Sequence, residues 1–317
     1  MAEIKEFADF PPEASAGDVT IQVDYSCLNY KDALAITGKA PIIRNFPMVP
    51  GIDLAGQVIA SQNPNFAKGD KVLVTSYGVG ENHWGGLASQ ARVKSEWVVK
   101  LPAALTPRQA MILGTAGYTA MLCVMALEKY GVTPDMGDIA VSGAAGGVGS
   151  VAIHILAKKG FKVTAISGRQ ATESEWLHEM GASKVIDRAS LSQAGKPLQR
   201  ELWAGAVDTV GSHILANLLA ATKYGGAVAA CGLAQGSDLP STVMPFILRN
   251  VALLGVDSVQ TPMATRKIAW ENLARFMSPQ ILERIIAREI GLDGAVAASQ
   301  DILAGKIRGR VLVKLAD

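Results

Sequence analysis

Hydrophobic and polar residues alternate in short segments up to about residue 100, and glycine, proline and asparagine interrupt the alternation. Val19, Ile21 and Val23 share one face of a predicted strand that runs to Tyr25. Further short strands are predicted around Val58 and through 72–74. This pattern is typical of an irregular β-rich domain.

The pattern changes from about Thr106, where short apolar strands alternate with longer helical stretches. That rhythm is typical of a parallel sheet covered by helices, and six strands suffice for a doubly wound sheet of the Rossmann type. The predicted strands lie at 139–141, 162–166, 185–186, 206–209, 227–231 and 253–256. The predicted helices between them include 151–159 and 173–180.

The C-terminal segment departs from this rhythm, with a predicted helix at 267–276 and a strand-like alternation at 310–315. We therefore expect an α/β protein of two domains. Residues 1–104 and 258–317 form the β-rich domain, and residues 105–257 form the Rossmann domain.

Composition excludes several functional classes. The chain has 317 residues, and its 30 Lys plus Arg against 28 Asp plus Glu leave a net charge of +2, so no large basic field is available for nucleic acid. Cys27, Cys123 and Cys231 form no CxxC spacing, which favours a reducing, cytoplasmic setting. The acidic residues before Ala14–Ala16 argue against a signal peptide. The uncharged run 110–127 contains glycine and threonine, so we expect a buried helix and no membrane span.

A glycine-rich turn, Ser142–Gly149, joins the first predicted strand of the Rossmann domain to the helix that follows. A dinucleotide pyrophosphate needs a tight turn, a bare backbone and a helix N-terminus whose N–H groups face the anion. Gly146, Gly147 and Gly149 meet these needs, although Ala144 stands where the usual fingerprint has its first glycine. The flanking strand and helix favour a dinucleotide site over a βα turn without a ligand.

The segment Ser167-Gly168-Arg169 follows the second predicted strand. NAD-binding proteins place an acidic residue there to bind the ribose 2′-hydroxyl, whereas an arginine accommodates a 2′-phosphate. A charge-assisted hydrogen bond is worth about 1.5–3 kcal/mol, which corresponds to a preference for NADPH of about ten- to a hundredfold. We therefore expect NADPH, with a solvated Arg169 as the alternative.

Three further motifs, Leu28–Asp32, Pro50–Asp53 and Gly80–Gly86, occur in the same chain as the glycine turn and Ser167–Arg169. Together the five motifs resemble the medium-chain dehydrogenase/reductase superfamily. Within it, the chain is similar to the acryloyl-CoA reductase family, often labelled quinone oxidoreductases of the YhdH type. The resemblance implies a GroES-like fold for the β-rich catalytic domain and an active site beside the Rossmann domain.

Many members of this superfamily are zinc alcohol dehydrogenases, but this chain does not match their zinc ligands. Their first cysteine ligand falls on Asn29, their histidine on Ile52, and their third ligand near Gly114 or Thr115. Catalytic zinc needs three N, S or O ligands and one open position. The resemblance therefore implies a zinc-independent enzyme.

The implied reaction is hydride transfer from NADPH to the β-carbon of a short 2-enoyl-CoA, foremost acryloyl-CoA, which becomes propanoyl-CoA. Hydrogen-bond donors that face the developing negative charge on the thioester oxygen lower the barrier. The resemblance implies that Tyr30 is a donor or cofactor clamp and that Asn29, Asp32, Asp53 and Arg310 line the site. Judged from the residues alone, Tyr30 can instead be a packed aromatic, and Asp53 with Arg310 a structural ion pair.

Further binding residues are expected for the cofactor and for CoA. The cofactor contacts implied by the resemblance are Tyr30, Ala145, Gly146, Gly147, Val148, Gly149, Ser167, Gly168, Arg169, Arg188 and Leu233. The phosphates of CoA call for basic residues, for which the candidates are Lys39, Arg44, Arg249, Arg266 and Lys267.

Other interpretations remain open. An NADPH:quinone oxidoreductase has the same fold, and a non-catalytic NADPH-binding protein is a third possibility because fold does not determine function. Family analogy implies a homodimer. Relatives begin with one more strand before the segment 1–4, so either the start was trimmed or an edge strand is missing.

Overall fold

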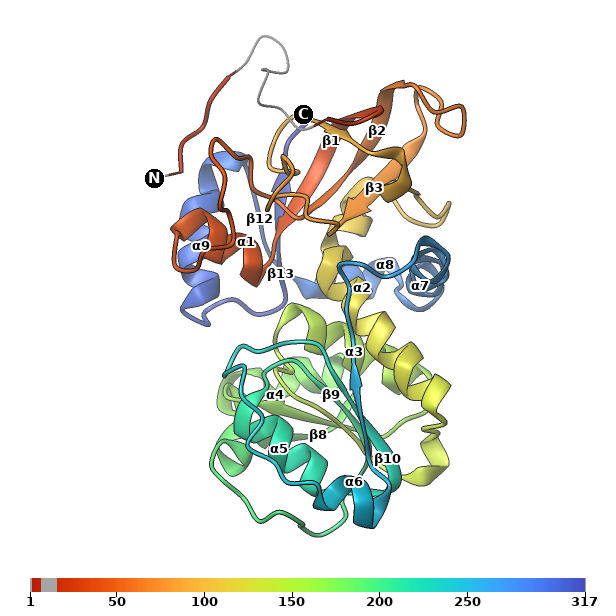
Figure 1. Cartoon of the computed structure of the whole chain (residues 1–317), viewed down its shortest axis with the longest axis vertical. Helices are drawn as coiled ribbons and strands as arrows, with labels where there is room; N and C mark the ends of the chain where they lie inside the picture. Colours follow the sequence, from red (N-terminus) through yellow and green to blue (C-terminus); the bar gives the residue numbers. More distant parts are fainter. Residues whose placement is uncertain (1, 7–15, 317) are drawn as a thin grey trace. The chain divides into compact units, whose positions relative to one another are not determined.

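The computed structural model describes residues 2–6 and 16–316, so most of the segment Ala14–Ala16 lies outside the described residues (Figure 1). The chain divides into two compact units. Unit 1 consists of Met1–Thr115 and Ser258–Asp317, and unit 2 consists of Ala116–Asp257. The first division falls inside a helix, later in the chain than the boundary expected at residue 104.

Unit 1 is built on a seven-stranded sheet with the strand order β12-β13-β1-β2-β3-β5, in which β4 also pairs with β1. The strands are β1 (Val19–Leu28), β2 (Asp53–Ser61), β3 (Lys71–Thr75), β4 (Gln90–Val93), β5 (Val99–Lys100), β12 (Ile286–Ile290) and β13 (Arg310–Lys314). The predicted alternation in β1 is confirmed, because Val19, Ile21 and Val23 are fully buried. The C-terminal strand β13 pairs antiparallel with β1 and sets Leu28 opposite Val311, which brings the chain end to the start of α1.

The helices of unit 1 are mostly absent from the sequence-based prediction. They are α1 (Tyr30–Thr37), α7 (Met263–Phe276), α8 (Pro279–Ile285) and α9 (Ala295–Leu303), of which only α7 was predicted. Helix α1 ends at Gly38, whose φ of 67° is left-handed and therefore suits glycine. Helices α1 and α9 pack against each other.

Unit 2 is a doubly wound α/β fold. Its six strands are all parallel and follow the order β11-β10-β9-β6-β7-β8, which is the Rossmann order. The strands are β6 (Ile139–Val141), β7 (Val163–Ser167), β8 (Ala182–Asp187), β9 (Trp203–Asp208), β10 (Thr222–Ala230) and β11 (Ala252–Gly255). Each matches a predicted strand, so the prediction of this fold is confirmed.

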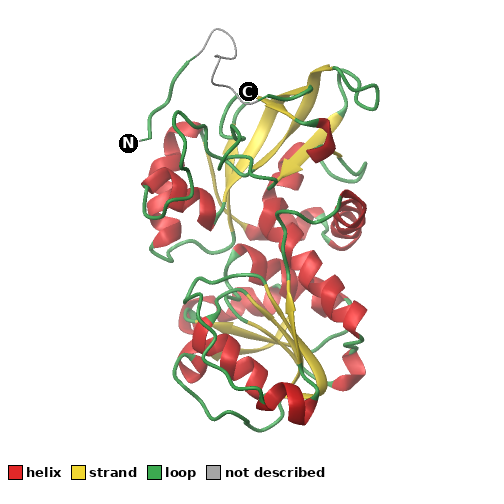
Figure 2. Ribbon diagram, viewed as in Figure 1, coloured by secondary structure: helices red, strands yellow, loops and turns green. Residues whose placement is uncertain are grey.

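Helices lie on both sides of the parallel sheet (Figure 2). They include α3 (Gly147–Lys158), α4 (Gln170–Glu179), α5 (Ser212–Ala220) and α6 (Met244–Arg249). β6 and β9 are fully buried, as expected for a parallel strand covered on both faces. Because the strands are parallel, their carboxyl ends meet at one edge of the sheet, where a ligand binds in this class of fold.

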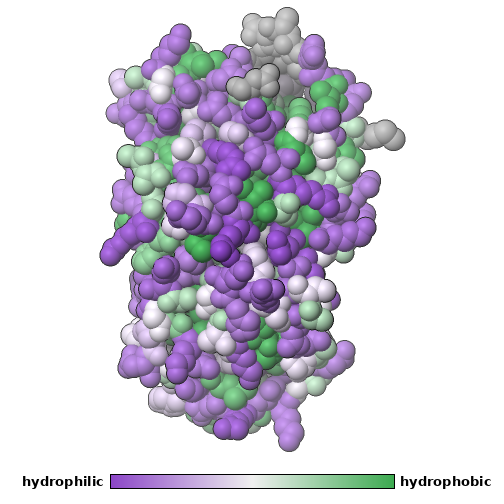
Figure 3. Space-filling model, turned by 180° about the vertical axis from the view of Figure 1, so that it is seen from behind, coloured by the Kyte–Doolittle hydropathy of each residue, from purple (hydrophilic) through white to green (hydrophobic). Residues whose placement is uncertain are grey.

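The long apolar helix α2 (Pro107–Tyr130) includes the uncharged run noted in the sequence. Of the described helices, it is the one long and apolar enough to cross a membrane, and 83% of its most apolar window is buried inside the protein. That burial is typical of a core helix. Hydrophilic residues predominate on the face of the protein drawn in Figure 3.

Candidate functional site

A buried polar cluster in unit 1 is centred on Asp53, the first residue of β2. Asp53 is fully buried, and its Oδ2 accepts hydrogen bonds from Asn29 Nδ2 at 2.8 Å and from the Cys27 thiol at 3.1 Å. The backbone N–H of Thr115 donates to the same oxygen at 2.8 Å. A buried carboxylate requires such partners, because desolvating it without them is costly.

The second carboxylate of the cluster, Asp32, is 1% exposed. Its Oδ2 accepts from Asn29 N at 2.9 Å and Asn29 Nδ2 at 3.0 Å, and its Oδ1 accepts from Ile52 N at 2.9 Å. The Asn29 amide therefore links Asp32 to Asp53. Burial, reinforced by the charge of Asp53, raises the pKa of Asp32 to about 6.

Arg310, the first residue of β13, provides the positive charge of the cluster and is 4% exposed. Its guanidinium donates to Asn29 Oδ1 at 3.0 Å, Cys27 Sγ at 2.9 Å and the Ile112 carbonyl at 3.1 Å. Its Nη2 lies 4.0 Å from Asp53 Oδ2. Arg310 and Asp53 are thus joined chiefly through shared partners, Asn29 and Cys27.

Helix α2 kinks at Gly114, which closes the cluster from the other side. Gly114 has φ 52° and ψ −156°, outside the helical region. A Cβ there would lie 2.6 Å from Cys27 Sγ and 2.7 Å from both Arg310 Nη2 and Asp53 Oδ2, so only glycine fits. The kink also directs the next residue, Thr115, toward Asp53.

Thr115 is a member of the cluster that the sequence did not identify as such. Its hydroxyl donates to Asp53 Oδ1 at 2.5 Å and lies 3.4 Å from the hydroxyl of Ser76. The available signal was Gly114, a glycine inside an otherwise helical pattern, which often has a packing or functional reason.

Tyr30 is the first residue of α1 and is 47% exposed. Its neighbour Asn29 and the carboxylate of Asp32 form the buried start of this helix. The cluster therefore holds in place the end of the helix that carries Tyr30, while the Tyr30 ring remains accessible.

The residues of the cluster do not fit a catalytic zinc ion. At the positions where the resemblance places the zinc ligands, Asn29 is a neutral amide and Ile52 is apolar. The third position falls near Gly114, which has no side chain, or Thr115, whose hydroxyl is bonded to Asp53. The Arg310 guanidinium, already a cation, contacts Cys27 and Asn29 instead. Among the described residues there is no group of three or more His, Cys, Asp and Glu side chains able to hold a metal.

The glycine turn of unit 2 has the close contacts that a dinucleotide site requires. Gly143 has a φ of 57°, and a Cβ at Gly149 would lie 2.4 Å from the Gly143 carbonyl oxygen. Gly146 immediately precedes α3, so the free N–H groups of the first helical turn face the space above the turn. The close backbone approach at Gly149 excludes a side chain at that position.

Two arginine side chains lie near the carboxyl end of β7. Arg169 Nη2 donates to the Ala145 carbonyl at 3.2 Å, which holds this guanidinium beside the glycine turn. A Cβ at Gly168 would lie 2.5 Å from Arg188 Nε, so the second guanidinium packs against Gly168. Ser167 is 4% exposed, and its hydroxyl accepts from Arg169 N at 3.0 Å. This arrangement suits a phosphate group.

The end of β9 supports the glycine turn from the neighbouring strand. Ser142 Oγ donates to Asp208 Oδ1 at 2.7 Å, and Gly211 N donates to Asp208 Oδ2 at 2.8 Å. Burial raises the pKa of Asp208. The sequence did not single out Asp208. Leu233, a predicted cofactor contact, follows β10 and is 63% exposed.

Two predicted CoA-binding residues are wrong. Arg266 is fully buried, where it donates to Thr75 and to the carbonyl of Ser258, and so it is inaccessible to a phosphate. Arg249 donates to the carbonyls of Ala220 and Gln199. Both guanidiniums stabilise the fold. Lys39, Arg44 and Lys267 are exposed.

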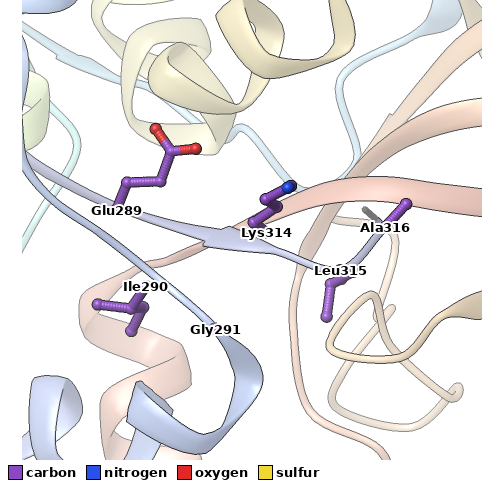
Figure 4. Close-up of a pocket in the computed structure, with 6 residues that line it drawn as sticks. All are labelled: Glu289, Ile290, Gly291, Lys314, Leu315 and Ala316. Atoms are coloured by element: carbon purple, nitrogen blue, oxygen red, sulfur yellow. The ribbon is translucent and has the colours of Figure 1, made fainter.

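A surface pocket of unit 1 lies at the ends of β12 and β13 and contains none of the predicted site residues (Figure 4). It is lined by Glu289, Ile290, Gly291, Lys314, Leu315 and Ala316. The carboxylate of Glu289 is already paired with Arg108 at 2.8 Å. None of the residues that line this pocket belongs to the Asp53 cluster.

Comparison with known proteins gives extensive matches. The family described as an alcohol dehydrogenase GroES-like domain matches residues 15–103, and the family described as a zinc-binding dehydrogenase matches residues 147–277. The probable acrylyl-CoA reductase AcuI of Escherichia coli K12 is 56% identical, with 94% of this chain and 91% of that protein covered. The acrylyl-CoA reductase AcuI of Ruegeria pomeroyi is 49% identical, with 94% and 90% covered.

A solved structure matches the chain in both fold and sequence. The yhdH oxidoreductase from Salmonella enterica in complex with NADP superposes with a TM-score of 0.96 at 52% identity, covering 100% of this chain and 96% of that one. The GroES-like and Rossmann folds expected for the two parts of the chain are confirmed by these matches.

Proposed function

Because the chain belongs to the medium-chain dehydrogenase/reductase superfamily, we propose that it is an NADPH-dependent reductase of the carbon–carbon double bond of short 2-enoyl-CoA thioesters. The substrate is acryloyl-CoA, which is reduced to propanoyl-CoA. The observation that carries this proposal is the sequence identity of 56% and 49%, over 94% of this chain, to two proteins named acrylyl-CoA reductase. We assign catalysis to residues 1–104 and 258–317, and NADPH binding to residues 105–257.

The cofactor is NADPH, and the residues of unit 2 fit it. Gly146, Gly147 and Gly149 would hold the pyrophosphate, because glycines leave the backbone open to a close approach of the anion. At Gly149 a Cβ would also collide with the Gly143 carbonyl oxygen. Arg169 and Arg188 would bind the 2′-phosphate. When bound, NADPH supplies a hydride to the β-carbon of the substrate. Ala145, Val148, Ser167, Gly168 and Leu233 complete the proposed cofactor contacts.

In unit 1, Tyr30 is proposed to contact the cofactor and the reacting thioester. Its hydroxyl is a suitable donor to the thioester oxygen, where negative charge develops. Asn29, Asp32, Asp53 and Arg310 are too deeply buried to do this directly. Their proposed role is to hold the start of α1, and with it Tyr30, in one position.

Zinc has no part in the proposed reaction. The hydrogen bonds of Arg310 to Cys27 and Asn29 occupy the polar groups that a metal would need. Stabilisation of the substrate oxygen then depends on hydrogen bonding alone.

The test is NADPH oxidation measured with acryloyl-CoA and with quinones. Steady oxidation with acryloyl-CoA and competition by free CoA are expected. Turnover of quinones without inhibition by CoA would instead establish the quinone reductase alternative. Tight NADPH binding without turnover of either substrate would indicate a non-catalytic binding protein.

A Tyr30→Phe variant tests the proposed role of the hydroxyl. We expect turnover to fall while unit 2 still binds NADPH. Unchanged turnover and unchanged NADPH affinity would remove Tyr30 from the site.

We also propose that the protein is a cytoplasmic homodimer that binds neither nucleic acid nor membrane. Supporting the dimer, β11 is an edge strand of the parallel sheet, and Val243, Ile247 and Leu248, at the start of α6 and along it just before β11 in the chain, are each more than half exposed. A second copy that covers this edge would pair the exposed backbone of β11 and bury these apolar side chains. Sedimentation at twice the chain mass of 33.2 kDa is expected, and a monomer would contradict the proposal.

A further inference from the structure

The segment between α1 and β2 carries two basic residues and an exposed aromatic residue. From Gly38 to Pro47 it contains Lys39 and Arg44 and no acidic residue. Both basic side chains are exposed. Phe46 is 78% exposed, more than any other large hydrophobic side chain that the structure describes. Its ring is therefore accessible to a ligand.

Both ends of this segment are anchored to the fold. Lys39 N donates to the Leu34 carbonyl at 3.2 Å, which fixes the start of the segment to the end of α1. Trp84 Nε1 donates to the Pro47 carbonyl at 3.3 Å, and Gly85 N donates to Val49 O at 2.7 Å. The basic and aromatic side chains therefore project from a loop whose ends are held.

Helix α1 sets the distance between this segment and Tyr30. Eight residues at about 1.5 Å per residue make α1 about 12 Å long, with Tyr30 at its first turn and Lys39 just beyond its last. The pantetheine arm of CoA has the backbone length of about four residues, so fully extended it spans about 15 Å between the thioester and the diphosphate. The far end of α1 therefore lies within reach of the phosphates of a CoA whose thioester is beside Tyr30.

We propose that the segment 38–47 is the nucleotide subsite for coenzyme A, an assignment that rests on the proposed function. Lys39 and Arg44 bind the diphosphate and the 3′-phosphate, and Phe46 stacks on the adenine ring. Basic side chains are required there because the C-terminal end of a helix carries partial negative charge, which by itself repels phosphate. Base stacking on an exposed aromatic is a common mode of nucleotide binding.

Two of the other basic residues considered for the phosphates of CoA are engaged within the fold. Arg266 is fully buried, and Arg249 is bonded to backbone carbonyls. Arg169 and Arg188 serve the dinucleotide site of unit 2. Lys39 and Arg44 are the two candidates that occur with an exposed aromatic on one short segment.

The experiment compares acryloyl-CoA with acryloyl-pantetheine, which has the same reacting group but lacks the nucleotide. Wild type, Lys39→Gln/Arg44→Gln, Phe46→Ala and the control Lys68→Gln are assayed by NADPH oxidation. Lys68 is an exposed lysine of unit 1 on the β2–β3 loop and is matched in charge. Because all four positions are exposed, melting temperatures are expected to stay unchanged.

The double variant is expected to raise KM for acryloyl-CoA about tenfold or more, with kcat and the KM for acryloyl-pantetheine unchanged. Phe46→Ala is expected to raise the same KM about fivefold or more. An unchanged KM for acryloyl-CoA in both variants, or an equal rise for acryloyl-pantetheine, overturns the subsite. So does a rise in Lys68→Gln as large as that in the double variant. Failure of the wild type to oxidise NADPH with either thioester would instead refute the proposed function.

Discussion

Replacing Arg310 by methionine tests whether the buried cluster depends on its one cation. The substitution keeps an unbranched side chain but removes the hydrogen bonds to Asn29, Cys27 and the Ile112 carbonyl. It also leaves the carboxylates of Asp32 and Asp53 buried without a positive charge. Removing one partner of a buried charge pair costs about 3–5 kcal/mol. We expect a loss of this size in the free energy of unfolding, measured by urea denaturation at neutral pH.

The pH dependence separates the loss of charge from a simple loss of packing. Without the cation, the pKa of Asp32, already raised to about 6, should rise further. A carboxyl pKa that is raised in the folded state destabilises that state increasingly as the pH rises from the unfolded pKa to the folded pKa, and by the full amount above it. The deficit of Arg310→Met relative to wild type should therefore shrink as the pH falls from about 7 to about 5.

A matched control is Leu312→Ala, two residues along the same strand. Leu312 is fully buried and uncharged, and its truncation costs a comparable amount of about 2–5 kcal/mol. Its deficit should not change over the same pH range. If Arg310→Met costs under about 1 kcal/mol, or if its deficit is as independent of pH as that of Leu312→Ala, the cluster is not held by the charge of Arg310.

Three further predictions concern other parts of the two sites. Arg169→Ala should weaken NADPH binding about tenfold while NADH binding stays nearly constant, and an equal loss for both cofactors in fluorescence titrations would contradict a 2′-phosphate contact. Gly149→Ala sets a Cβ 2.4 Å from the Gly143 carbonyl oxygen, so NADPH binding should be lost or strongly reduced, and wild-type affinity would show that the turn tolerates a side chain. Because the pKa of Asp32 rises from 3.8 to about 6, wild type should lose up to about 3 kcal/mol relative to Asp32→Asn as the pH increases from about 4 to about 6.5, a trend that parallel denaturation curves would exclude.

The parts of the protein that the sequence predicted well are those determined by local pattern. Strands β6, β7 and β9 of unit 2 were found because a parallel strand covered on both faces is a continuous apolar run. The glycine turn was found because pyrophosphate binding needs glycines at fixed spacing just before a helix. Helix α1 was missed, although Asn29 followed by Asp32 is a local signal for a helix start.

Other features required contacts between distant residues. Arg188 packs against Gly168, and the neighbouring Cys231 together with burial raises the pKa of the Cys123 thiol; neither pair is near in sequence. The burial of Arg266 could not be predicted from the sequence either, because an arginine is usually exposed. Tertiary structure alone ruled it out as a ligand for phosphate.

By itself, the sequence determined the Rossmann fold, the place of the dinucleotide turn and the arginine that follows the second strand, because each depends on residues within one βαβ unit. Only the tertiary structure decided how Cys27, Asn29, Asp53, Thr115 and Arg310 come together. These residues come from four separate stretches of chain, joined by the pairing of β1 with β2 and β13 and by the kink of α2 at a glycine. The physical reason is that buried charges are stable only with partners, and the fold supplies those partners from remote positions.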